Sequence, residues 1–385
     1  MFCVAFNAFR ATTTATTSLV GNAESEDERR QIIKVSLSLG AVLGLIVMTV
    51  LQLSGPWCLA AMGVPGTSPL FKPAHAYLGV RSWAAPAVLG IVVAEGAFRG
   101  YGDTKIPLLA SLAASFINLI LDPVLMFSLG MGVAGAAAAT GLSQLGAAAV
   151  YAYFLVKRHM LPLRGTKSSV RSVGIIRTIL GANLAMVCKQ GSLLLAWAYA
   201  TARATRIGTA QVAAHQVALS CWLVFALILD GAAVSAQVLM SRSLGNIKKV
   251  RSLISYMGRF AWVQGLATTG LIMLSSNTLP TLFTSDKVIR GHLHSLMPQL
   301  AWQQILVSLT LVAESLAIGG NQFQLLAFGT TISTIAAMWQ LRMATDVVSI
   351  WSKGIVTLFV GRLITALIGT LRVLHEQSRQ KNKVE

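Results

Sequence analysis

The chain has 385 residues, of which 55% are hydrophobic and 11% are charged, and its formal net charge is +18. A soluble domain carries about 25% charged residues, and the mean hydropathy of this chain is +0.67. Apolar runs of about 20 residues recur along the whole sequence, as membrane-spanning helices require. We therefore expect an all-α polytopic membrane protein, because the short alternating segments of a transmembrane β-barrel are absent from the sequence.

The positive charge does not indicate a nucleic-acid partner. The basic residues lie between the apolar runs, which is typical of the loops on the cytoplasmic side of a membrane protein. The sequence contains no HExxH pattern, and the cysteines (Cys3, Cys58, Cys188 and Cys221) lack the spacing of a metal site. We expect these cysteines to be reduced and buried.

In chain order, residues 1–20 are moderately apolar and predict part of a helix. Ten complete spans follow, near 33–53, 77–98, 107–129, 133–156, 174–202, 209–239, 256–279, 297–320, 324–345 and 352–374. They predict an N-terminal helical bundle over 1–156, a basic connector over 157–173 and a C-terminal six-helix bundle over 174–375. Residues 376–385 form a polar tail that we expect to be disordered. The connector is rich in Lys and Arg, so we expect it to face the cytoplasm.

The two halves of the chain repeat weakly. Glu95 stands five residues before Gly100, and Glu314 stands five before Gly319, at an offset of 219. The order of spans and loops supports the repeat better than these few identities do. Transporters are often built from such repeats, with the substrate bound between the halves. On the same alignment, we expect that the first half lacks one whole helix and the start of another.

Two polar residues stand out in the span near 107–129. Asn118 and Asp122 are four residues apart, so they share one face of a helix. A carboxylate among apolar residues is costly in a membrane unless it has a partner or a polar cavity, which makes Asp122 a candidate functional residue. The alternative is that Asp122 caps the helix break at Pro123, where proline removes a backbone hydrogen bond.

Four stretches resemble the multidrug and toxic compound extrusion (MATE) transporters, particularly the DinF-type branch with its plant-like members. They are EGAFRGYGDTKIPL (95–108), NLILDP (118–123), AAHQ (213–216) and LDG (229–231). The resemblance implies two six-helix bundles around a central cavity, of which this chain would hold part of the second helix and all later ones. It also implies exchange of organic cations, organic acids or drug-like solutes against H⁺ or Na⁺.

The resemblance further implies a cation site in the first bundle. Related members use an Asp and an Asn one turn apart, a Thr on the following helix and an Asp on the first helix. Asn118 and Asp122 match the first pair, and Thr140 matches the Thr by position. The first-helix Asp has no counterpart here. Oxygen ligands suit Na⁺, and a buried carboxylate can also exchange a proton, so the coupling ion stays open.

Five further residues are candidates to line a cavity, and each has an alternative. For Lys189 the alternatives are attraction of an anionic substrate and pairing with an acid such as Asp230. For Asp230 they are lining the cavity and capping a neighbouring helix. His215 fits a structural hydrogen bond better than a proton carrier. For Glu95 and Glu314, contact with solvent or local pairing explains the residue as well as a transport role does. The local partner of Glu95 would be Arg99, one turn along the helix.

A charged pair is also expected near the end of the span at 324–345. Arg342 and Asp346 are four residues apart, so we expect them to neutralise each other on one turn of helix.

Together these features predict a cation-coupled antiporter that exports organic solutes or xenobiotics by alternating access. A lipid-linked oligosaccharide flippase of the same superfamily and a non-transporting fragment are the alternatives. The sequence holds no GxxxxGK[ST] loop, so we expect secondary rather than ATP-driven transport. A membrane-embedded enzyme would need clustered His or carboxylates on adjacent helices, and none is visible in the sequence, so we expect no enzymatic activity and no cofactor. We expect a monomer whose partners are membrane lipid and a small organic solute. The sequence does not distinguish among the plasma membrane, the vacuole and the plastid envelope as the membrane that holds the protein.

Overall fold

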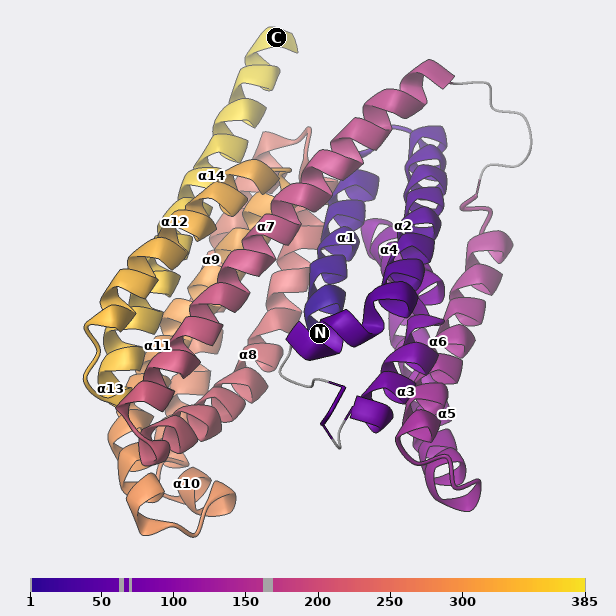
Figure 1. Cartoon of the computed structure of the whole chain (residues 1–385). Helices are drawn as coiled ribbons and strands as arrows, with labels where there is room; N and C mark the ends of the chain where they lie inside the picture. Colours follow the sequence, from indigo (N-terminus) through magenta and orange to yellow (C-terminus); the bar gives the residue numbers. More distant parts are fainter. Residues whose placement is uncertain (1, 62–65, 69–70, 162–168, 385) are drawn as a thin grey trace. The chain divides into compact units, whose positions relative to one another are not determined.

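The structure is a computed structural model that describes residues 2–61, 66–68, 71–161 and 169–384, and side chains within 12–60, 66–68, 71–161 and 177–379 (Figure 1). Throughout the described ranges the regular structure is helical. This confirms the predicted all-α fold. The chain divides into two compact units, Met1–Asn183 and Leu184–Glu385. The division lies within one long helix, beyond the predicted start of the second bundle at residue 174. Residues 162–168 of the predicted connector lie outside the described residues.

The first unit follows the predicted order of spans. Its helices are α1 (Phe2–Asn22), α2 (Glu26–Ala61), α3 (Phe71–Ser82), α4 (Ala85–Gly100), α5 (Lys105–Pro123), the π-helical turn η1 (Val124–Ser128) and α6 (Gly132–Lys157). Helices α3 and α4 bend by 52° at the break between them and together fill the span predicted near 77–98. Proline at position 123 ends the regular α-helix because it lacks the N–H that would bond the preceding turn.

Helix α7 (Ser169–Ile207) leads into the second unit. It is followed by α8 (Thr209–Ser243), α9 (Ile247–Leu274), α10 (Thr278–Phe283), α11 (Lys287–Gly319), α12 (Phe323–Arg342), α13 (Val347–Ser349), η2 (Ile350–Ile355) and α14 (Val356–Val384). Helix α14 continues to Val384, so the expectation of a disordered tail was wrong over residues 376–384. Gln377 explains part of this order, because its side-chain oxygen accepts a bond of 2.6 Å from the backbone N–H of Gly245.

Seven helical segments in the described chain are long and apolar enough to cross a membrane, or eight if the bent pair α3 and α4 counts as one span. The chain is therefore a multi-pass membrane protein. Helices α9 and α12 lie where spans were predicted but are not among the seven. They are grouped with the membrane-spanning helices because of where they lie in the second bundle, and not because of their composition.

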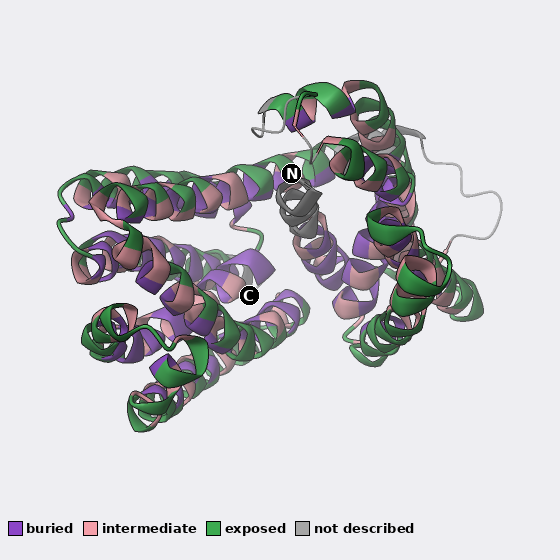
Figure 2. Cartoon of the chain, turned by 60° about the horizontal axis from the view of Figure 1, so that its bottom comes forward, coloured by how far each residue is buried: buried purple, intermediate pink, exposed green. Residues whose placement is uncertain are grey.

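Each unit has a central helix that packs against two earlier helices of the same unit. Helix α4 contacts α1 and α2 in the first unit, and α11 contacts α8 and α9 in the second. Glycines permit the closest approaches: a Cβ atom at Gly44 would lie 2.5 Å from Cα of Pro86, and one at Gly265 would lie 2.8 Å from Cα of Ile305. The equivalent contacts confirm the internal repeat. Buried residues gather inside each unit (Figure 2).

Candidate functional site

Asn118 and Asp122 lie on the partly buried stripe of α5. The residues of this helix alternate between half-buried pairs, at 113–114, 117–118 and 121–122, and exposed pairs such as 119–120. Leu119 is 72% exposed, whereas Asn118 and Asp122 are half-buried. The stripe contacts α6, because the Ile117 side chain lies against Gly146. Asp122 therefore faces the packed side of its helix.

Two contacts fix the register of α5 and η1 against α6. A Cβ atom at Gly146 would lie 2.8 Å from Ile117, and one at Gly135 would lie 2.7 Å from the backbone of Leu125. The two segments are thus antiparallel. Thr140 lies between the contact residues Gly135 and Gly146 of α6, and Asp122 lies between the contact residues Ile117 and Leu125 on the facing segment. This register brings Thr140 to about the level of Asp122. Thr140 is half-buried, and its hydroxyl donates to the carbonyl of Ala136 at 2.8 Å.

One polar atom of Asp122 and one of Asn118 are buried without a hydrogen bond in the described chain. Oδ1 of Asp122 and Nδ2 of Asn118 have no hydrogen-bond partner among the described residues, and no bond there joins either of them to Thr140. Buried polar atoms in folded proteins are nearly always paired. An unpaired carboxylate oxygen can accept a proton or bind a hard cation such as Na⁺, so the arrangement suits a small positive ion.

A cavity of about 560 Å³ lies elsewhere in the same unit, among α2, α3 and α6. Its lining is mainly apolar and includes Trp83 and Leu142, with Gln52 and His75 as polar groups. The amide of Gln52 donates to the carbonyl of Gly79 at 2.9 Å and to Ser82 at 2.8 Å. Apolar cavities with a few polar groups are the usual form of organic-ligand sites.

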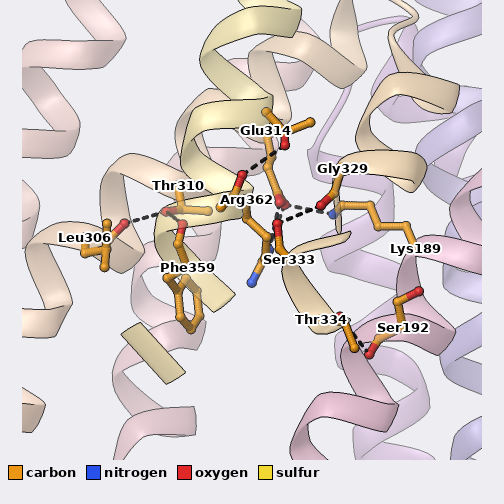
Figure 3. A network of polar contacts seen from close by, with 12 residues as sticks. Lys189, Ser192, Leu306, Thr310, Glu314, Gly329, Ser333, Thr334, Phe359 and Arg362 are labelled. Carbon is orange, nitrogen blue, oxygen red and sulfur yellow. Dashed lines mark hydrogen bonds and ion pairs between the residues drawn. The ribbon is translucent and has the colours of Figure 1, made fainter. Parts of the chain in front are cut away.

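A buried charge cluster occupies the second unit (Figure 3). Glu314 of α11 accepts three hydrogen bonds, from Nζ of Lys189 at 2.8 Å and from Nε and Nη2 of Arg362 at 2.8 and 2.9 Å. Lys189 belongs to α7 and Arg362 to α14, so the cluster joins three helices. The three residues are 3–7% exposed. The guanidinium of Arg362 also lies over the ring of Phe359, 4.8 Å from its centre.

These contacts show which acid pairs with Lys189. Its partner is Glu314, while Asp230 is exposed and forms no ion pair among the described residues. Asp230 still acts electrostatically on Lys189. Sequence reasoning gave Arg362 no role. The signal that could have found it was a second basic residue within an apolar span, because such a charge needs a partner.

His215 has the contacts of a structural residue. It is fully buried, and Nε1–H of Trp351 donates to its Nδ1 at 3.2 Å. Tryptophan can only donate, so Nδ1 must accept and the imidazole must be neutral with its proton on Nε2. That nitrogen lies 3.2 Å from the hydroxyl of Thr201. The ring therefore links α7, α8 and η2, as the structural alternative expected.

Two local pairings were also predicted. Glu95 does pair with Arg99 one turn along, at 2.5 Å. The predicted pair of Arg342 and Asp346 was wrong: no ion pair joins them in the described chain, because α12 ends at Arg342. Asp346 instead begins the next helix, where its carboxylate accepts from the backbone N–H of Ser349 at 2.6 Å.

Comparison with known proteins identifies the family. The family model described as MatE matches residues 2–124. Protein DETOXIFICATION 43 of Arabidopsis thaliana is 31% identical over 345 residues, which is 88% of this chain and 64% of that protein. The chain belongs to the MATE family. A second relative, DNA damage-inducible protein F of Escherichia coli, is 26% identical over 218 residues, which is 56% of this chain and 46% of that protein.

The solved structures agree on the fold. A crystal structure of a MATE protein in complex with MaD3S matches 99% of this chain and 86% of its own, with a TM-score of 0.84 and 23% identity. The MATE fold and family predicted from the sequence are thus confirmed. The chain spans roughly half to two thirds of the length of the curated plant relatives that it matches.

Proposed function

We propose that this MATE protein is a secondary active transporter that exports organic solutes or xenobiotics in exchange for H⁺ or Na⁺. The cation binds at Asp122, with Asn118 and Thr140 beside it, and its binding biases which side of the protein is open. Export then follows from alternating access, without ATP and without a catalytic step.

The observation that carries this proposal is the buried, unpaired oxygen of Asp122. An acid on the packed stripe of a membrane helix is costly, and the described chain gives it no compensating cation. A bound H⁺ or Na⁺ removes that cost. Because the cost of the buried carboxylate is removed only when the ion is bound, the site can couple ion occupancy to the conformation of its bundle.

The cavity among α2, α3 and α6 supports the solute half of the proposal. Its volume suits a drug-sized molecule, and its lining combines apolar surface with the indole of Trp83. The lipid-linked oligosaccharide flippase is less well supported, because such a function needs several available cations in a cavity. In the second unit, both buried cations of the described cluster are paired with Glu314.

The test is transport by the full chain in proteoliposomes, with an imposed H⁺ or Na⁺ gradient and a fluorescent organic cation as solute. Replacing Asp122 with Asn keeps the shape of the side chain but removes its exchangeable charge, so ion-driven transport should fall to the level of empty vesicles. A matched control is Asp286→Asn, since Asp286 is an exposed helix cap and Asn also caps helices.

The two gradients separate the coupling ions. Transport driven by a proton gradient without Na⁺ identifies H⁺, and transport that needs Na⁺ at constant pH identifies Na⁺. Full ion-driven transport by Asp122→Asn, with normal protein insertion, would show that Asp122 is not the coupling residue.

A further inference from the structure

The start of α9 carries a cluster of basic residues that the proposed transport cycle does not use. From the end of α8 into α9 the chain holds five basic residues and no acid, and they are Arg242, Lys248, Lys249, Arg251 and Arg259. All five are exposed. No ion pair joins any of them to an acid in the described chain. This end of the second bundle therefore presents uncompensated positive charge to its surroundings.

The equivalent helix of the first unit, α2, starts with balanced charge. Its opening sequence EDERRQIIK holds three acids and three bases. Arg29 pairs with Glu26 at 2.6 Å, and Arg30 lies 3.9 Å from Asp27. A helix at this position of the bundle can thus be packed and oriented without excess charge. The tendency of basic residues to gather on one side of a membrane protein therefore does not by itself require the basic cluster of α9.

The exposed side of α9 changes character along the helix. After the basic start it continues with Tyr256, Phe260 and Trp262, and then with aliphatic residues such as Val263 and Leu271, all of them exposed. We call this side the α9 face. The order of basic, aromatic and aliphatic residues is that of a helix entering a membrane, because Trp and Tyr gather at the level of the lipid headgroups. Helix α9 has 28 residues, and about 20 are enough to cross the hydrocarbon core, so its basic start lies at or outside the headgroup level.

Arg259 lies at the aromatic level of the α9 face. It is three residues from Tyr256 and from Trp262, so the three side chains are neighbours on the helix surface. Nε–H of Arg259 donates to the carbonyl of Ser255 at 3.3 Å, which directs the side chain back toward the basic start of the helix. The terminal N–H groups of its guanidinium have no carboxylate partner among the described residues. A guanidinium in this state can bind a phosphate through two parallel hydrogen bonds.

We propose that the α9 face binds the headgroup of an anionic phospholipid. The guanidinium of Arg259 binds the lipid phosphate beside Tyr256 and Trp262, and the acyl chains lie along the aliphatic residues that follow. The other basic residues of the cluster lie beyond the headgroup and attract its net negative charge, as basic clusters beside membrane spans do. The apolar continuation of the α9 face favours a lipid over a soluble anion or an acidic protein segment, because neither of these would cover that surface.

The experiment measures lipid binding to the full chain, purified in an uncharged detergent. Phosphatidylglycerol with brominated acyl chains is titrated into the micelles, because bromine quenches a nearby tryptophan. Trp262 lies on the α9 face, and its share of the fluorescence is the difference between the wild type and Trp262→Phe. Quenching of this share should saturate with phosphatidylglycerol. Brominated phosphatidylcholine, whose headgroup is neutral overall, should need at least about fivefold more lipid, because one basic residue beside an anionic surface contributes about 1 kcal/mol.

The decisive variant is Arg259→Gln, which leaves the helix packing intact because Arg259 is exposed. Its affinity for phosphatidylglycerol should fall about fivefold, and Arg259→Lys, which keeps the charge, should lose less. The double variant Lys248→Gln/Lys249→Gln should bind phosphatidylglycerol more weakly but phosphatidylcholine as the wild type does, since these residues respond to the net charge of the lipid. The matched control is Lys287→Gln, because Lys287 is exposed at the start of α11, beyond the other end of α9.

Three results overturn the proposal. They are equal affinity of the wild type for the two lipids, wild-type affinity in Arg259→Gln, and displacement of the lipid by an equal concentration of glycerol phosphate or of a polyglutamate peptide. The last result would identify a soluble anion or an acidic protein segment as the partner. Lipid binding is independent of the coupling role of Asp122, so Asp122→Asn should bind phosphatidylglycerol as the wild type does.

Discussion

Glu314 should be the most important single residue for the stability of the second bundle. Its carboxylate is the only acceptor that the described chain gives to the charged groups of Lys189 and Arg362, through three bonds of 2.8–2.9 Å. Glu314→Gln keeps the size of the side chain but leaves two buried cations without a counter-charge. Removing one partner of a buried ion pair costs about 3–5 kcal/mol, and we expect a loss of this order.

The matched variant is Lys189→Gln, which removes a charge from the same cluster. Its cost should be smaller, because it loses about 1.5–3 kcal/mol of one charged hydrogen bond but also removes the excess buried charge. The double variant Glu314→Gln/Lys189→Gln should be more stable than Glu314→Gln alone, since one of the two uncompensated cations is gone. Such non-additivity is expected for residues of one network.

The assay is denaturant unfolding of the purified full chain in detergent, followed through tryptophan fluorescence, with the midpoints of the four proteins compared. Trp197, Trp222 and Trp351 form a packed group in the same bundle and report on it. The reasoning is refuted if Glu314→Gln is no less stable than Lys189→Gln, or if the double variant shows the sum of the two single losses.

Two further predictions concern the first bundle. Gly135→Ala should impair ion-driven transport, because the new Cβ would lie 2.7 Å from the backbone of Leu125 and would shift α6 relative to Asp122; Gly231→Ala, with open space around it, is the control in the same transport assay. The pKa of Tyr101 is raised to about 12 by burial and by its hydrogen bond to Glu26. Its contribution to stability is therefore complete below about pH 10, the ordinary tyrosine value, and disappears as the pH rises through about 12. Tyr101→Phe should lose this alkaline dependence in unfolding measurements, and an unchanged dependence would assign it to another group.

The sequence was sufficient for the helices and for the local pairs within them. Long apolar runs predict spans because a membrane leaves the backbone few alternatives. A separation of four residues predicted that Asn118 and Asp122 share one helix face and that Glu95 lies beside Arg99. The same rule failed for Arg342 and Asp346 because it holds only inside a continuous helix, and a turn separates these two.

The charge cluster of the second bundle could not be predicted in this way. Glu314 is 125 residues from Lys189 and 48 from Arg362 along the chain. Their meeting depends on the rotation of α7, α11 and α14 about their axes, and no local spacing encodes it. Only the need of each buried charge for a partner is visible in the sequence, and three such charges admit more than one pairing.

The two bundles share one helix arrangement but differ in the sign of their uncompensated buried charge. In the first, Asp122 is an acid whose buried oxygen has no cation or donor in the described chain. In the second, Lys189 and Arg362 are two cations that share one acid. Because the helix packing around α4 and α11 is equivalent, this difference comes from a few side chains and not from the fold. The first bundle therefore holds an acid without a partner in the described chain, and the second holds one buried positive charge in excess.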